Sequence, residues 1–296
     1  MDGIFNVNKA ANMTSHDVVA RVRRLVQQKR VGHAGTLDPA ATGVLPICLG
    51  QATRVAEYLS EGGKAYRATI RFGCETDTYD ADGRILREAP VALVEEDIRA
   101  ALPAFLGPQL QVPPLYSAIK RNGQPLYKLA RAGGDVAPPP GRTVTIYALE
   151  IVSYQLPDLV LDIECSKGTY IRSLAFDLGQ VLGPGAHLAS LIRTRSGPFT
   201  LSQSIHLEEL AQALLDGSWE DYLYAPDEAL LDFDAAIVGE RNEWRLLHGL
   251  DLVFPETARH NAGDLLRTYA LDGRFLGILR WEDEQRRWQP HKVLTG

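Results

Sequence analysis

Residues 31–45 are the stretch that most restricts how this chain can fold. The segment, VGHAGTLDPAATGVL, holds three glycines, one proline and a single acid, Asp38. Glycine reaches positive φ at no steric cost and proline fixes its own φ near about −65°, so the backbone has to turn sharply here. Because the backbone of such a loop aims its polar side chains, we expect the functional site at this loop.

The residues alone leave two interpretations of Asp38 open. An Asp followed by Pro typically begins a helix, with the Asp as N-cap and the Pro in the first helical position, and the spacing by itself favours this structural role. An aspartate also has an ordinary pKa of about 3.9, so it is ionised at neutral pH and can act as a nucleophile without a neighbouring base. The two roles are compatible, since the positive end of a helix dipole keeps an acid ionised.

The length of the chain favours more than one domain. At 296 residues it exceeds what one compact core usually holds, which predicts one large domain and one small one. The N-terminus lacks a basic lead and a long apolar run, and nothing later has the uncharged length that spans a bilayer. The cysteines Cys48, Cys74 and Cys165 are odd in number and far apart, which indicates reduced thiols. We therefore expect a cytoplasmic protein with no membrane partner.

The net charge of −6 argues against a nucleic-acid-binding protein until its distribution is considered. Residues 1–200 carry 22 Lys+Arg against 19 Asp+Glu, whereas residues 201–296 carry 9 against 18. Ten of those acids, and no Lys or Arg, fall within residues 201–240. Because this acidic segment would repel phosphate, we expect it to face away from any bound RNA.

The residues before the Asp38 loop predict a strand and then a basic helix. Apolar residues at 4, 5 and 7 indicate the strand, and Thr14 or Ser15 can cap a helix whose valines share one face. The opposite face is either an ordinary solvated surface or a set of phosphate contacts, and its position beside the loop favours phosphate. Its basic residues are Arg21, Arg23, Arg24, Lys29 and Arg30. After the loop, residues 66–72 alternate apolar and polar side chains, as a half-buried strand does.

Residues 107–142 form a long excursion rich in proline, glycine, basic residues and tyrosine. Such an excursion within a compact domain is usually functional or disordered. Basic and aromatic side chains together suit an arm that closes over RNA phosphates and bases, and a poorly ordered surface loop is the alternative. Near the C-terminus, Asp272 and Gly273 lie between two alternating apolar runs, which predicts a hairpin.

Several segments together resemble one known family. Residues 32–45, GHAGTLDPAATGVL, closely resemble the active-site motif of the bacterial tRNA pseudouridine-55 synthases, the TruB family. The resemblance continues through KAYR at 64–67, SAIK at 117–120 and CSKGTYIRSL at 165–174, in the family's order. It implies an α/β (α+β) fold with a mixed, mainly antiparallel sheet flanked by helices.

The resemblance also implies a division of the chain. A catalytic domain would cover residues 1–232 and include an RNA-binding thumb at 107–142. A small β-rich PUA-like RNA-binding domain, where the resemblance is weaker, would cover residues 233–296. Such a domain helps to hold the tRNA acceptor stem, and a purely structural cap is the alternative.

The family's roles carry over to matching positions of this chain. Asp38 corresponds to the nucleophile, and Tyr66 to an active-site tyrosine that stacks on the target base and is positioned for the later proton removal. Residues 171–182 predict a helix that begins with Arg172, and helix starts disfavour cations unless a carboxylate is near. By resemblance that carboxylate is Asp38. The resemblance further implies three substrate contacts, namely His33, which enters the RNA loop, Tyr170 and Leu191.

One segment departs from the family. Lys9-Ala10-Ala11-Asn12 stands where a Lys-Pro-x-Gly pattern is usual, so the geometry around Lys9 is in doubt and we leave Lys9 out of the predicted site. Asn12 can still adopt a left-handed conformation and preserve the turn.

The implied reaction breaks the N1–C1′ bond of a uridine in the tRNA T loop and rejoins the base through C5. It needs no redox change or group donor, and the sequence has no phosphate-cradling or dinucleotide fingerprint, so we expect no cofactor. Residues 76–83 look like a calcium loop but lack the glutamate of an EF-hand, so we assign no metal. Whether the carboxylate attacks C6 of the base or C1′ of the ribose stays open.

Two other functions compete with this expectation. The first is an RNA chaperone that opens and refolds tRNA, and the second is the guide-RNA-dependent catalytic subunit of a larger particle. The long arm at 107–142 favours a stand-alone enzyme, and we expect a monomer that acts on the tRNA T stem-loop without a guide RNA.

Overall fold

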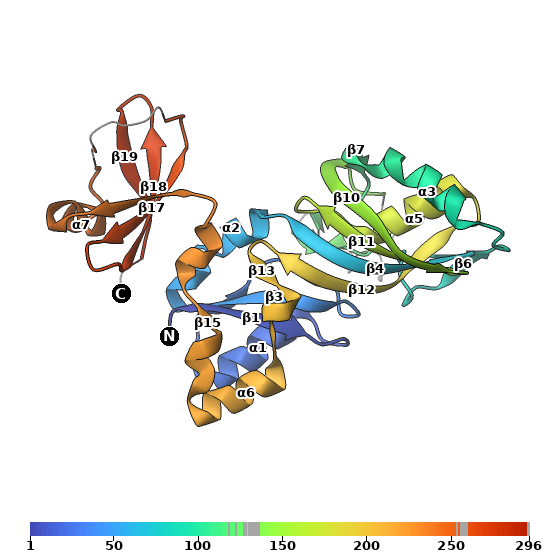
Figure 1. Ribbon diagram of the computed structural model, residues 1–296, viewed down its shortest axis with the longest axis horizontal. Coiled ribbons are helices and arrows are strands. Elements are labelled where there is room, and N and C mark those ends of the chain that lie inside the picture. Colours follow the sequence, from blue (N-terminus) through green and yellow to red (C-terminus); the bar gives the residue numbers. More distant parts are fainter. Residues whose placement is uncertain are drawn as a thin grey trace.

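The computed structural model describes residues 1–117, 119–121, 123–126, 129, 137–252, 254 and 260–294 (Figure 1). Tyr127, Lys128 and Arg131, which contribute to the predicted basic and aromatic arm, lie outside the described residues. None of the helices that the structure describes is long and apolar enough to cross a membrane.

An 11-stranded sheet organises the larger part of the chain. Its strands follow the order β14 (Ile205–His206), β1 (Gly3–Lys9), β3 (Thr42–Leu49), β12 (Ala186–Ser196), β4 (Lys64–Phe72), β11 (Asp158–Cys165), β10 (Arg142–Gln155) and β7 (Gly107–Gln111). Three short strands join at its side, namely β2 (Val31–His33) on β3, β13 (Phe199–Thr200) on β12 and β15 (Leu223–Tyr224) on β1. Only the β1–β14 and β3–β12 pairs are parallel among the described strands of this sheet. The predicted mixed, mainly antiparallel sheet is therefore confirmed.

Helices cover the sheet at both ends (Figure 1). One end carries α1 (Ser15–Leu25) and α6 (Leu207–Asp216), and the other carries α3 (Glu95–Ala101) and α5 (Ile171–Leu182). The short α2 (Ala56–Glu61) lies between the large sheet and the C-terminal part. Shorter 3₁₀ turns are η1 (Gly50–Arg54), η2 (Leu102–Phe105), η3 (Leu201–Gln203), η4 (Ser218–Tyr222) and η5 (Pro226–Leu230). Two small hairpins pair β5 (Cys74–Thr76) with β6 (Ile85–Glu88), and β8 (Lys120–Arg121) with β9 (Gln124–Pro125).

The local sequence explains helix α1. Thr14 is its N-cap and forms a capping box with Asp17, in which each side chain accepts from the other residue's backbone N–H. The valines of the helix face the sheet and are buried, as the 3.6-residue period requires. The predicted cap and apolar face are both confirmed.

Strand β4 lies in the middle of the large sheet, between β12 and β11. Its residues alternate between buried and less buried positions along the whole strand, as the predicted period of two requires. Tyr66, Ala68 and Ile70 belong to the main hydrophobic core. The strand therefore holds Tyr66 in a fixed place under the rest of the site.

The C-terminal part forms a second sheet of four strands. Its order is β16 (Asp234–Val238), β17 (Leu265–Ala270), β18 (Phe275–Glu282) and β19 (Arg287–Val293), and α7 (Glu240–Leu247) packs beside it. The predicted hairpin at Asp272-Gly273 is confirmed, because it joins β17 to β18. Contacts with the larger part include the Tyr58 and Phe233 rings, 5.5 Å apart, and an ion pair of 2.7 Å between Lys292 and Glu57.

The structure contradicts one interpretation of Asp38. No helix begins at Asp38-Pro39, since residues 39 and 40 form a bend and strand β3 starts at residue 42. The Ala41 backbone N–H donates to the Asp38 carbonyl at 3.1 Å, which closes a tight turn rather than a helix. Asp38 is therefore not an N-cap, and its side chain is available for another role.

Candidate active site

The Asp38 loop is fixed on both sides of the carboxylate. The Leu37 backbone N–H donates to Ser15 Oγ at 2.9 Å, and Ser15 Oγ donates to the Leu37 carbonyl at 3.1 Å. On the other side, Lys9 Nζ donates to the Pro39 carbonyl at 3.0 Å. Because its two neighbours are held, the Asp38 side chain has few ways to move while remaining about half exposed.

The altered turn before α1 keeps its shape. Asn12 adopts the left-handed conformation that the sequence allows, with φ 62°, and its N–H donates to the Pro39 carbonyl at 2.9 Å. Lys9 is completely buried and also donates to the carbonyls of Ala10 and Met13. Burial lowers the pKa of Lys9 to about 8, and the nearby Asp38 carboxylate opposes this shift. Lys9, which we left out of the predicted site, therefore supports the Asp38 loop.

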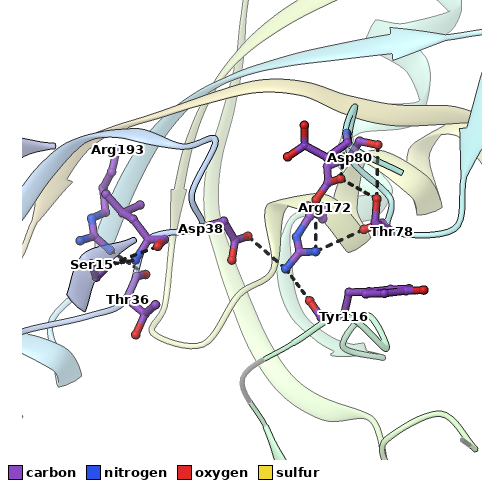
Figure 2. A network of polar contacts seen from close by, with 10 residues as sticks. Ser15, Thr36, Asp38, Thr78, Asp80, Tyr116, Arg172 and Arg193 are labelled. Atoms are coloured by element: carbon purple, nitrogen blue, oxygen red, sulfur yellow. Dashed lines mark hydrogen bonds and ion pairs between the residues drawn. The ribbon is translucent and has the colours of Figure 1, made fainter. Parts of the chain in front are cut away.

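Arg172 lies next to Asp38, as Figure 2 shows. Its Nη2 is 3.0 Å from Asp38 Oδ2, and its side chain is only 6% exposed, against 48% for Asp38. Arg172 also donates to the carbonyls of Thr78 and Tyr116. Helix α5 begins one residue earlier, so the helix start and these carbonyls hold the guanidinium in one orientation. The predicted ion pair is present and partly buried.

A second carboxylate, Asp80, shares Arg172 on the side away from Asp38 (Figure 2). Its Oδ2 is 3.3 Å from Arg172 Nη1. Burial raises the pKa of the Asp80 carboxyl, against the opposing effects of the Thr78 hydroxyl and of Arg172. Sequence reasoning missed Asp80, because it placed this residue in an ordinary polar turn at 76–83.

Arg193 is another buried cation that sequence reasoning missed. It is 1% exposed, and its guanidinium donates to three carbonyls, those of Gly35, Thr36 and Val44. It therefore fixes the Asp38 loop onto strands β3 and β12. Gly43 makes this approach possible, because a Cβ there would lie 2.3 Å from the Arg193 carbonyl oxygen and its φ is +98°. The sequence signal was weak, because Arg193 is one of two arginines on β12, with Arg195 two positions later, and no local pattern distinguishes them.

A cavity of about 410 Å³ brings most of the predicted site together. This volume lies within the range of small-molecule sites. Asp38, Arg172 and Leu191 also line a smaller cavity of about 100 Å³, so the two cavities share this wall. The predicted site residues on the larger cavity are Asp38, Tyr66, Tyr170, Arg172 and Leu191. His33 is not among its lining residues in the described part of the chain.

Tyr66 contributes a buried phenol to the cavity. Burial raises its pKa, and the Arg193 guanidinium beside the hydroxyl opposes that shift. The phenol is therefore protonated at neutral pH, and its ring is the part of the side chain that can contact a base.

His33 lies at the end of β2, beside His16 on the first turn of α1. The two ring centroids are 5.4 Å apart in an edge-on arrangement. Burial lowers the pKa of His33 to about 4, and His16 and Arg193 act in the same direction. His33 is therefore neutral at pH 7, so it offers RNA an aromatic ring and a hydrogen-bonding group rather than a positive charge.

This shift predicts a pH dependence of stability. Because the folded-state pKa of His33 lies below its ordinary value of 6.5, the unfolded chain binds the proton first as the pH falls. We expect this to lower the free energy of unfolding between about pH 6.5 and pH 4, and we expect the His33→Phe variant to lose less over that window. Denaturant unfolding at pH 7, 6, 5 and 4.5 measures how the free energy of unfolding of each protein changes with pH. The variant His206→Gln, at an exposed histidine, is the control. Parallel curves for wild type and His33→Phe would contradict the prediction.

The basic face of α1 is partly engaged by the acidic segment. Arg21 Nη2 on α1 is 3.0 Å from Glu208 Oε1 on α6. We expected α1 to face RNA phosphates and the acidic segment to face away from RNA, but the two helices contact each other through this ion pair.

Among the residues that the structure describes, no three His, Cys, Asp or Glu side chains are placed to hold one metal ion.

Two family profiles match this chain. Residues 23–171 match the TruB family pseudouridylate synthase (N terminal domain), and residues 172–238 match the tRNA pseudouridylate synthase B C-terminal domain. Curated relatives carry the name tRNA pseudouridine synthase B. The relative from Pseudomonas aeruginosa (strain UCBPP-PA14) is 43% identical and the alignment covers 97% of this chain and 94% of the relative. The relative from Burkholderia mallei (strain NCTC 10247) is 46% identical, with 95% and 93% covered.

Two solved structures share this fold. An H/ACA RNP bound to a substrate RNA containing 2′-deoxyuridine matches with a TM-score of 0.78 and 25% identity, covering 99% of this chain and 85% of the other. A Cbf5-Nop10-Gar1 complex matches with a TM-score of 0.75 and 29% identity, covering 94% and 78%.

Proposed function

Because the chain belongs to the TruB family of pseudouridylate synthases, we propose that its cavity isomerises uridine 55 in the T loop of tRNA to pseudouridine. The observation that carries this proposal is the Asp38–Arg172 pair, 3.0 Å apart, at the wall of a cavity that also contains Tyr66. This arrangement supplies one oriented carboxylate and one aromatic ring beside it.

The reaction conserves every atom of the nucleoside apart from one exchanged proton. The N1–C1′ bond breaks, the base turns, a C5–C1′ bond forms, and the C5 proton leaves while N1 gains one. A carboxylate can promote this by forming a covalent intermediate, which divides one difficult step into two easier ones. Asp38 takes this role, whether it attacks C6 of the base or C1′ of the ribose.

The other residues act around Asp38. Arg172 orients the carboxylate by a charge-assisted bond and is itself anchored by Asp80. Tyr66 stacks on the target base and lies where the later proton removal takes place. Tyr170 and Leu191 line the pocket for the nucleotide.

A stacked uridine hides its reactive atoms, so the enzyme has to take the base out of the RNA loop at a cost of a few kcal/mol. Stacking on an aromatic ring returns about 1–3 kcal/mol per base. In the proposal, His33 enters the RNA loop and stabilises its rearranged form, the thumb at residues 107–142 closes over the stem-loop, and residues 233–296 act as a PUA-like domain that contacts the tRNA.

We propose a stand-alone monomer that works in the cytoplasm, where its tRNA substrate would be. The stand-alone assignment is supported by 43–46% identity to relatives named tRNA pseudouridine synthase B, against 25–29% to the H/ACA RNP and the Cbf5-Nop10-Gar1 complex. The catalytic subunit of a guide-RNA particle is the alternative.

The purified protein should form pseudouridine in transcript tRNA without added RNA, protein or cofactor. Tritium release from tRNA labelled at C5 of its uridines follows the reaction, and site mapping should place one product residue in the T loop. A transcript with cytidine at position 55 serves as the matched control and should release no tritium. No release from the uridine transcript would overturn the assignment, and release only after a guide RNA is added would favour the particle subunit.

A further inference from the structure

Arg142 is a cation of the cavity for which the proposed reaction has no role. It is the first residue of β10 and the last residue of the predicted thumb at 107–142, and it pairs in register with Gln111 of β7. It lines the 410 Å³ cavity together with Asp38 and Tyr66. A half-buried arginine at the edge of a site for RNA requires an explanation.

The structure around Arg142 is well fixed. Its guanidinium carbon lies 4.5 Å from the centre of the Tyr170 ring, and its Nη2 donates to the Gly168 carbonyl. Gln111, which is buried, holds the Tyr170 backbone by accepting from its N–H at 2.7 Å and donating to its carbonyl at 3.0 Å. Because the Tyr170 backbone is held and the guanidinium contacts both the Tyr170 ring and the Gly168 carbonyl, the position of the guanidinium is defined.

The other cations of the cavity are compensated within the protein. Arg172 Nε also lacks a hydrogen-bond partner, but the Arg172 guanidinium is paired with two carboxylates. Arg193 donates to three carbonyls. Lys64 likewise donates to three backbone carbonyls. Arg142 combines two features that these three cations do not share: its Nε is buried without a hydrogen-bond partner, and no carboxylate among the described residues pairs with it. A buried cationic donor left unsatisfied is costly, so the protein retains a position that an anion would stabilise.

We propose that Arg142 binds an RNA phosphodiester at the edge of the cavity and so positions the nucleotide that enters it. This inference rests on the proposed function, since the RNA substrate supplies the anion. One face of the guanidinium is covered by Tyr170, so its donors are presented in the plane, which suits the paired oxygens of a phosphate. Arg142 is a positioning residue, and the chemistry stays with Asp38.

The test is the salt dependence of tRNA binding. In the Asp38→Asn background, which prevents turnover, Arg142→Met should weaken binding of unmodified tRNA about tenfold. It should also reduce the slope of log K against log salt by about one, because one phosphate contact is lost. Arg142→Lys keeps the charge and should restore most of the slope. Arg71→Met is the matched control, because Arg71 lies on strand β4 and pairs at the surface with Asp158 at 2.7 Å.

Single-turnover rates then separate positioning from a merely structural role. With Asp38 intact, Arg142→Met should raise the tRNA concentration needed for half-maximal rate more than it lowers the rate at saturation. An unchanged binding constant and salt slope, with equal loss of rate in Arg142→Met and Arg142→Lys, would overturn the inference. Absence of pseudouridine from the wild-type reaction would instead reject the proposed function, while the binding measurements would still report on Arg142.

Discussion

Asp38→Asn should abolish pseudouridine formation. The amide keeps the size and hydrogen-bonding shape of the side chain but cannot act as a nucleophile, so turnover should fall by roughly 10⁴-fold or more. The amide oxygen of this variant can still accept from Arg172, and the backbone bonds to Leu37 and Pro39 are unaffected. The fold and the affinity for tRNA should therefore be kept. Tritium release, equilibrium binding and thermal unfolding measure the three quantities.

The control for this variant is Asp162→Asn. Asp162 also pairs with an arginine, Arg67, at 2.7 Å, but on the exposed side of the large sheet. It should retain wild-type turnover. If Asp38→Asn kept more than a few per cent of the activity, the carboxylate would not be the nucleophile. If the variant lost turnover yet still accelerated tRNA refolding, the chaperone function would exist beside the isomerase.

Arg172→Met should lower both turnover and stability. Without the guanidinium, Asp38 loses its orienting partner, and Asp80, whose side chain is 21% exposed, loses its counter-charge. Misplacement of a reacting group by about 1 Å costs on the order of 100-fold in rate, so we expect at least that loss. Breaking a buried ion pair on one side costs roughly 3 kcal/mol in the free energy of unfolding. Single-turnover kinetics and denaturant unfolding measure the two effects.

Arg67→Met is the matched control for Arg172→Met. Arg67 makes a bidentate pair with Asp162, but both side chains are substantially exposed, 48% and 39%. An exposed pair contributes less than about 1 kcal/mol, so this variant should stay close to wild type in stability and turnover. Arg172→Lys restores the charge without the planar fork, so it should recover stability more than activity. Equal effects of Arg172→Met and Arg67→Met would show that burial of the Asp38–Arg172–Asp80 group has no special importance.

Local sequence patterns predicted much of the fold that surrounds the site. The capping box at Thr14, the alternation in β4, the α5 helix and the hairpin at Asp272-Gly273 all appear where the residues placed them. These features depend on side chains within a few positions of one another, which periodicity and capping rules describe. The helix start expected at Asp38-Pro39 was wrong because loop contacts with Ser15 and Lys9 hold that backbone in a turn instead.

By itself, the sequence determined the family, the class of sheet and the identity of the single acid in the turning loop. Short runs of residues specify those properties. Only the tertiary structure decided that Asp80 shares Arg172, across 92 positions, and that Arg193 fixes the loop through Val44, across 149 positions. It likewise decided that Arg142 stacks on Tyr170 while its Nε lacks a hydrogen-bond partner. Such contacts have no periodic signal, because burial and charge balance select them only after distant strands have packed together.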